Sequence, residues 1–231
     1  WPDRVPLTAG TRRGAIDVAL YAGVLAVGVY LLFAGGVDAA TGTAGRMDQA
    51  GIAALLGLLL LLGLRDKVSF LGARPEIYAT MLAVGLFAPS QWIVAWQFIF
   101  LFIWWGAASS KLNRHFPFVV SVMISNAPLV GPKALKRKLW RDYPNDMLPS
   151  RFAAGLAHFG TVQEFTWPLL LITVDNEVVR TIAIVGMILF HLNITSMFPL
   201  AVPLEWNIFM IFGTLFLFGH YGDVALSTLD K

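Results

Sequence analysis

The chain has 231 residues, of which 57% are hydrophobic and only 13% are charged, and its mean hydropathy is +0.69. Because about a quarter of the residues in a soluble domain are charged, this composition excludes an ordinary soluble protein and indicates a polytopic membrane protein. A formal net charge of +3, without a stripe of Lys and Arg, gives no support to nucleic-acid binding. The absence of cysteine excludes disulfides, thiolate catalysis and Cys-ligated metals, and the four histidines have no metal-ligand spacing.

Seven apolar runs along the chain are candidates for membrane-spanning helices, each of which needs roughly 20 apolar residues. They cover residues 15–33, 50–64, 77–88, 91–110, 152–174, 179–201 and 205–221. A further apolar run, 116–131, contains Pro117, Asn126 and Pro128, so we expect a re-entrant or interfacial segment there. The sequence therefore predicts an all-α, polytopic transmembrane bundle of about seven spans, forming a single transmembrane domain over residues 1–231 within a longer chain.

The basic residues predict an orientation for these spans. If the N-terminus is cytoplasmic and every span crosses, all 17 Lys and Arg residues are cytoplasmic except Arg46, Arg180 and Lys231. This asymmetry is what the positive-inside rule describes. The excess of Arg over Lys and the Ala-, Gly- and Leu-rich early spans suit a GC-rich bacterium. We therefore expect a multi-pass protein of the bacterial plasma (inner) membrane, with the polar connector 132–150 in the cytoplasm.

Two predicted spans carry polar side chains near their centres. Glu164 lies in the fifth span, where a carboxylate costs a few kcal/mol on insertion scales. It must face the bundle interior, either as a helix–helix hydrogen bond or as part of a functional pocket. His158, six residues earlier, lies roughly 240° round the helix from Glu164, so the two do not share a face closely. His191, in the sixth span, shares a face with Thr195 and must find its partner in protein, water or a bound molecule.

The fourth span ends in a pair of tryptophans, five small residues and Lys111. Gly106 and Ser110 form a small-xxx-small pair, which permits close helix approach. Lys111 allows two interpretations: it marks the end of the span and extends to the interface, or it has a special role. The basic run 133–141 also allows two: it sets the topology, or it binds anionic lipid headgroups.

Three motifs follow one another in a characteristic order. They read WWGAASSKL at residues 104–112, EFTWPLLL at 164–171, and FHL at 190–192 before an aromatic and aliphatic run at 209–218. This order resembles the membrane domain of vitamin K-dependent gamma-carboxylase and its bacterial relatives, the horizontally transferred transmembrane domain. The resemblance covers residues 91–222, which we expect to be a carboxylase-like membrane core. A looser similarity connects the chain with uncharacterised actinobacterial membrane proteins built on this domain.

The resemblance implies a role for Lys111, because the lysine of the carboxylase branch is the base toward reduced vitamin K. No soluble substrate-binding domain is present, and the usual Trp-x-x-Gly after the lysine motif is replaced by NRHFPF at residues 113–118. Our orientation also places Lys111 in the cytoplasm, whereas the carboxylase works on the lumenal side. The likeness in fold therefore extends further than the likeness in activity.

Two functions remain open at this point. In the first, an integral membrane protein of uncharacterised activity has a polar intramembrane cavity that binds or acts on a lipid or quinone-like molecule. A desolvated Lys111 would deprotonate the substrate, with Glu164 and His191 as its catalytic partners. The residues expected to bind that quinone or lipid cofactor are Trp104, Trp105 and Asn193.

The alternative is a non-catalytic membrane subunit or scaffold of a larger envelope complex, with Glu164 and His191 as interhelical links. A proton-coupled transporter is a third hypothesis, but the inverted repeats typical of transporters are not visible. The sequence does not decide whether the protein is an enzyme. Its expected partners are membrane lipids and other membrane subunits, and not nucleic acid.

Overall fold

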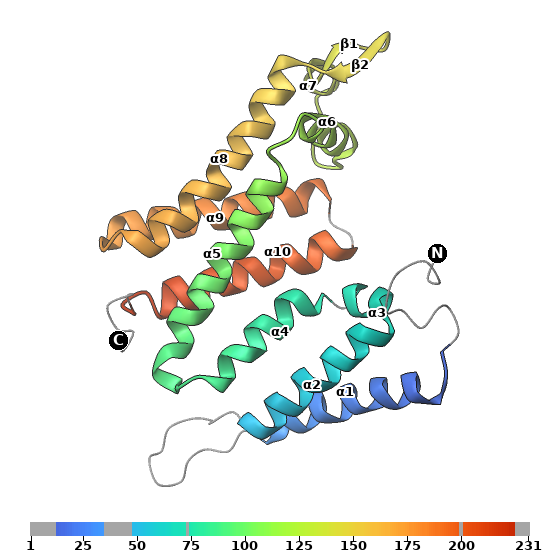
Figure 1. The fold of residues 1–231 in the computed structure, drawn as a ribbon. Coiled ribbons are helices and arrows are strands. Elements are labelled where there is room, and N and C mark those ends of the chain that lie inside the picture. The colour runs from blue at the N-terminus through green and yellow to red at the C-terminus, as the bar shows by residue number, and fades with distance from the viewer. Residues whose placement is uncertain (1–12, 35–47, 73, 199–200, 225–231) are drawn as a thin grey trace. The chain divides into compact units, whose positions relative to one another are not determined.

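The computed structural model describes residues 13–34, 48–72, 74–198 and 201–224, which are mostly helical (Figure 1). The chain packs as two compact units, Trp1–Trp96 and Gln97–Leu229. The second unit nearly coincides with the segment 91–222 that carries the sequence resemblance. Of the basic residues used to predict the orientation, Arg4, Arg12, Arg46 and Lys231 lie outside the described residues.

Among its described residues, the first unit contains four helices and two 3-10 turns. Its elements are α1 (Ala15–Phe33), α2 (Gln49–Arg65), α3 (Lys67–Gly72), α4 (Pro75–Ala83), Val84–Leu86 and Pro89–Gln91. Two contacts show that α1 and α2 run antiparallel. Arg13, just before α1, pairs with Asp66, just after α2, and the Tyr30 hydroxyl near the end of α1 donates to Asp48, the N-cap of α2.

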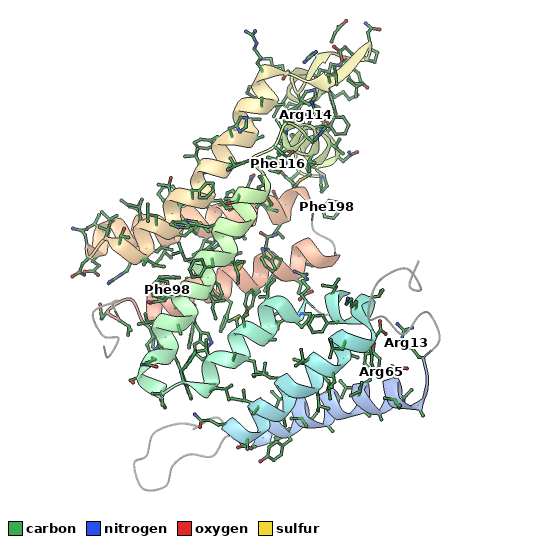
Figure 2. All side chains as sticks on the ribbon, viewed as in Figure 1. Arg13, Arg65, Phe98, Arg114, Phe116 and Phe198 are labelled. Carbon is green, nitrogen blue, oxygen red and sulfur yellow. The ribbon has the colours of Figure 1, made fainter. Side chains whose placement is uncertain are left out.

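An ion pair between a buried aspartate and a partly exposed arginine fixes one end of this helical hairpin. Asp17 of α1 is only 1% exposed and accepts hydrogen bonds from Arg65 at 2.7 and 3.3 Å and from the Gly14 backbone N–H at 2.8 Å. Figure 2 shows Arg13 and Arg65 at the same end of the hairpin. This arrangement agrees with the predicted orientation, which places both arginines on one side of the membrane.

The second unit contains the longer helices. Its elements are α5 (Trp92–Ser110), which begins in the first unit, α6 (Phe116–Asn126), α7 (Lys133–Lys138), β1 (Trp140–Asp142), β2 (Asp146–Pro149), α8 (Arg151–Thr173), α9 (Glu177–Met197), α10 (Ala201–Thr214) and the π-helical turns η4 (Leu215–His220). The strands β1 and β2 form an antiparallel hairpin with Trp140 opposite Pro149. The sequence indicates only that this connector is polar, and its pattern predicts neither the short helix nor the hairpin.

Helical periodicity explains which faces of α8 and α9 are buried, because residues three and four apart lie on one side of a helix. On α8 the buried residues are Ala153, Ala157, Thr161, Glu164, Pro168 and Leu171. On α9 they are Ala183, Met187 and His191. Both polar residues singled out in the spans therefore face the interior of the unit, as lipid on the outside requires.

Two glycines allow the helices of the second unit to approach closely. A Cβ on Gly213 of α10 would lie 2.0 Å from the Phe100 ring of α5, and a Cβ on Gly186 of α9 would lie 2.7 Å from the Trp167 ring of α8. Gly106, in contrast, has no neighbour within 4 Å and is exposed, as is Ser110. The small-xxx-small pair permits close helix approach, but within the described part of the chain no helix packs closely against Gly106.

The predicted runs agree with observed helices to within a few residues. The helices differ, however, in whether they are long enough to cross a membrane. Among the described residues, three helical stretches are long and apolar enough to cross a membrane: Ala15–Phe33, Pro89–Ser110 and Glu177–Met197. Helix α8 has 23 residues and is about 34 Å long, but polar residues interrupt its apolar sequence. The other apolar helices are shorter: Gln49–Arg65, Ile77–Leu86, Phe116–Asn126 and Leu204–His220. Seven crossings therefore stay a prediction.

Helix α6 occupies the run for which we expected a re-entrant or interfacial segment. Its 11 residues extend about 16 Å, roughly half of a 30 Å hydrocarbon core. One face of the helix, formed by Pro117, Ser121 and Ile124, is buried against the unit. A helix of this length cannot span a bilayer by itself.

Candidate functional site

Lys111 lies directly after α5 and its side chain turns into the second unit. Its ammonium donates a hydrogen bond to Oε2 of Glu164 on α8. The Glu164 side chain is only 4% exposed and that of Lys111 is 22% exposed. The rings of Phe116 and Phe190 each have their centroid 5.8 Å from the Nζ of Lys111. Lys111 is therefore partly desolvated and paired, and its ammonium does not extend freely to the interface.

A cavity of about 440 Å³ begins at this ion pair. It lies between α6, α8 and α9, and its wall is mostly aliphatic and aromatic, with Lys111, Gln163 and Asn193 as the polar members. The α6 side contributes Phe116, Val120, Met123 and Ile124, α8 contributes Leu156, Ala157, Phe159, Gly160 and Gln163, and α9 contributes Phe190, Asn193, Ile194 and Met197. Its volume falls in the range of pockets that enclose small organic ligands.

The two ends of the cavity differ in character. Gln163 and Phe190 lie at the end next to Lys111, whereas Leu156 and Met197 lie seven residues away on α8 and α9, about 10 Å along each helix. Leu156 and Met197 pack against an apolar cluster formed by Ile124, Leu139, Trp140 and Ala153. The cavity thus runs from a charged end to an apolar end, which is the arrangement that an amphiphilic molecule requires.

His191 belongs to a neighbouring polar network that connects three helices. The indole N–H of Trp104 on α5 donates to Nε2 of His191 at 2.9 Å, and Nδ1 of His191 lies 2.7 Å from Oδ1 of Asn207 on α10. Since Trp104 can only donate, Nε2 must accept, and the proton of a neutral ring must sit on Nδ1 and be donated to Asn207. All three residues are at least 98% buried. This network ties α5, α9 and α10 together in the centre of the unit.

The structure separates the residues that we predicted to form one site. Lys111 and Asn193 line the cavity, and Glu164 joins them through its contact with Lys111. His191 and Trp104 lie in the neighbouring network, and Trp105 donates to the backbone carbonyl of Phe165 at 3.2 Å. These last three residues do not line the cavity. No hydrogen bond joins Glu164 to His191 in the described part of the chain.

Several residues of the site were missed by sequence reasoning. Asn207 and Gln97 are buried polar residues within apolar runs, and Gln97 donates to the backbone carbonyl of Leu217 at 2.9 Å. The criterion that identified Glu164, a polar side chain inside a span, would have identified both of them. The apolar wall contributed by α6 had no such signal, because its residues resemble any other lipid-facing or core residues.

A family model described as "Transmembrane protein of unknown function (DUF3556)" matches residues 1–231. No curated protein and no solved structure matches the chain significantly.

Proposed function

The chain belongs to this family of transmembrane proteins, and we propose that its second unit binds an amphiphilic lipid or quinone-like molecule in the cavity between α6, α8 and α9. The single observation that carries the proposal is the charged pair of Lys111 and Glu164 at one end of a mostly apolar cavity. A purely structural gap between helices would be expected to close or to be apolar throughout, because proteins pack their interiors densely.

The wall of the cavity defines the class of ligand. Lys111, Gln163 and Asn193 offer hydrogen-bond donors to oxygen atoms of a headgroup or ring. The aromatic rings of Phe116 and Phe190 flank the ammonium, where a flat ring could stack. Met123 and Met197 provide flexible, polarizable contacts for a chain of variable shape. A carbonyl- or hydroxyl-bearing ring with a short apolar tail matches these features.

The resemblance to the carboxylase family adds a chemical role to this binding site. In our proposal Lys111 is the base, and Glu164 accepts the proton that the ammonium must release before the amine can act. The free amine then accepts a proton from a hydroxyl of the bound molecule, which leaves the ligand as an anion beside the restored ammonium. His191 does not touch the ligand in this scheme; it positions α9 through Trp104 and Asn207.

The alternative, a non-catalytic subunit or scaffold, is supported by a different observation. The ammonium of Lys111 has a carboxylate partner, and both ring nitrogens of His191 have partners within the protein. Buried polar groups that are fully satisfied need no ligand to explain them. The two functions differ in one requirement: a ligand-binding protein needs the cavity to be empty of side chains, whereas a scaffold does not.

A pair of glycine substitutions on α8 tests this difference. Gly160 lines the cavity, and a Cβ added there would meet only Phe190 at 3.8 Å, so Gly160→Leu should fill the cavity without breaking the helix. Gly155 is exposed, with no neighbour within 4 Å, and Gly155→Leu is the matched control. Native mass spectrometry of the purified chain would identify a co-purified amphiphile, and decylubiquinone would serve as an added probe.

We expect the wild-type chain and Gly155→Leu to retain the amphiphile and to be stabilised against heat by decylubiquinone, because a ligand that binds only the folded state raises Tm. Gly160→Leu should lose both effects while folding normally. If neither the wild-type chain nor Gly155→Leu binds an amphiphile, the scaffold is the better interpretation. The same holds if Gly160→Leu binds the amphiphile as well as Gly155→Leu does.

A further inference from the structure

A second cavity lies outside the helical bundle, between α6, α7 and the β1–β2 hairpin. It has a volume of about 670 Å³ and is lined on the α6 side by Phe118, Val122, Ser125 and Asn126. The remaining wall consists of Lys133, Lys136, Arg137, Trp140, Tyr143 and Met147. None of these residues lines the cavity beside Lys111, so the two sites are distinct.

The charge of this cavity has one sign. Three basic side chains line it and no carboxylate does. The nearby Asp142 and Asp146 of the hairpin accept hydrogen bonds from Asn145 and from the Leu148 backbone, and neither lines the cavity. Among the described residues, no ion pair involves Lys133, Lys136 or Arg137. Three cations that share a concave surface without a counter-charge attract an anion.

A serine hydroxyl adds a second, independent indication of a ligand. Ser121, one turn earlier on α6, donates to the carbonyl of Pro117 at 2.9 Å, as helical serines often do. Ser125 Oγ is buried, lines the cavity and has no hydrogen-bond partner among the described residues. A buried hydroxyl without a partner is unusual and costs free energy. Rotation of the Ser125 side chain toward the cavity would allow this hydroxyl to donate to an anionic oxygen there.

The rim of the cavity is apolar and exposed. Phe118, Val122 and Met147 are 46%, 37% and 41% exposed, and the guanidinium of Arg137 lies over the Tyr143 ring at 5.9 Å. Basic groups beside exposed apolar side chains are the pattern of a surface that meets lipid headgroups and acyl chains together. We propose that this cavity binds the phosphate headgroup of an anionic phospholipid, with the acyl chains against the exposed face of α6.

The test uses the full chain in detergent, titrated with phosphatidylglycerol or phosphatidylcholine and observed by native mass spectrometry. The double substitution Lys133→Gln and Arg137→Gln removes two charges from the cavity. The matched control, Lys138→Gln and Arg141→Gln, removes the same two charges from exposed residues of the same connector that do not line it. Arg137→Lys keeps the charge, and Ser125→Ala removes only the unpaired hydroxyl.

We expect the wild type to bind phosphatidylglycerol more tightly than phosphatidylcholine. The cavity double variant should lose about fivefold in affinity for each charge removed, whereas the control should lose far less. Arg137→Lys should retain most of the binding. Ser125→Ala should weaken binding a few-fold without lowering Tm, since its hydroxyl has no partner in the protein.

Three outcomes would overturn the proposal. Equal losses in the cavity and control variants would mean that general attraction, and not a site, binds the lipid. Equal affinity for phosphatidylcholine would remove the requirement for an anion. Displacement of the lipid by inorganic phosphate or glycerol phosphate at similar concentration would assign the cavity to a free phosphate compound.

Discussion

Lys111 and Glu164 are 53 residues apart in sequence, and their hydrogen bond joins the end of α5 to the middle of α8. The contact is an ion pair inside the second unit, where neither the ammonium nor the carboxylate is well solvated. A lysine that merely ended a span would contribute little to packing. The observed pairing makes Lys111 part of the fold as well as of the proposed site.

Lys111→Ala should lower the free energy of unfolding by about 3 kcal/mol, because it leaves the nearly buried Glu164 carboxylate without its partner. The double variant Lys111→Met and Glu164→Gln should recover most of the loss, since no buried charge remains. Thermal unfolding in a mild detergent would measure both. A single variant as stable as the wild type would show that the pair is not held in the folded protein.

Trp104→Phe should cost about 1–3 kcal/mol, because it leaves Nε2 of the buried His191 without a donor. Trp105→Phe is the control and should cost less, since Trp105 is only partly buried and donates to a helical carbonyl. Nitrogen NMR of the His191 ring should show the neutral tautomer protonated on Nδ1 in the wild type. A ring protonated on Nε2 would contradict the assigned network.

Gly213→Ala should destabilise the second unit by about 1–3 kcal/mol, because its methyl group would overlap the Phe100 ring. Gly106→Ala provides the comparison, since Gly106 also lies in a helix but has open space around it. That substitution should be neutral or slightly stabilising, as alanine favours helix over glycine. Unfolding midpoints that fall equally in both variants would contradict the close contact between α5 and α10.

Cysteine labelling can test the predicted topology without background, because the chain has no cysteine of its own. Arg141→Cys in the β1–β2 hairpin and Asp175→Cys after α8 place exposed thiols beyond opposite ends of a helix about 34 Å long. If α8 crosses the membrane, a membrane-impermeant maleimide should label them from opposite sides of sealed vesicles. Labelling of both from one side would rule out a crossing by α8.

Hydropathy predicted the helices better than it predicted their contacts. The limits of α1 and α8 follow from where apolar runs begin and end, which is a local property. That Glu164 and His191 face inward also follows from sequence, since lipid accepts neither. The grouping of Lys111 with Glu164 came from the resemblance and not from hydropathy. Asn207 was not predicted as the partner of His191, because it reaches the ring only after α9 and α10 pack together.

The tryptophan pair and the small residues after it show why the site was only partly predicted. Adjacent helical residues are about 100° apart, so Trp104 and Trp105 could not both face one pocket, but the sequence does not indicate which one turns inward. Small residues at 106–110 fit helix contact and helix ending equally well. The close approach occurs instead at Gly213 and Gly186, whose neighbours are large aromatic rings far away in sequence.

The Trp104–His191–Asn207 network has a consequence for the charge at the centre of the second unit. Both hydrogen bonds run in the same direction, from the Trp104 indole N–H to Nε2 of His191 and from the Nδ1–H of His191 to Oδ1 of Asn207. Each ring nitrogen thus has its partner when the ring is neutral, and a proton added at Nε2 would displace the donor of Trp104. The network therefore joins α5, α9 and α10 through polar contacts without placing a charged ring among them.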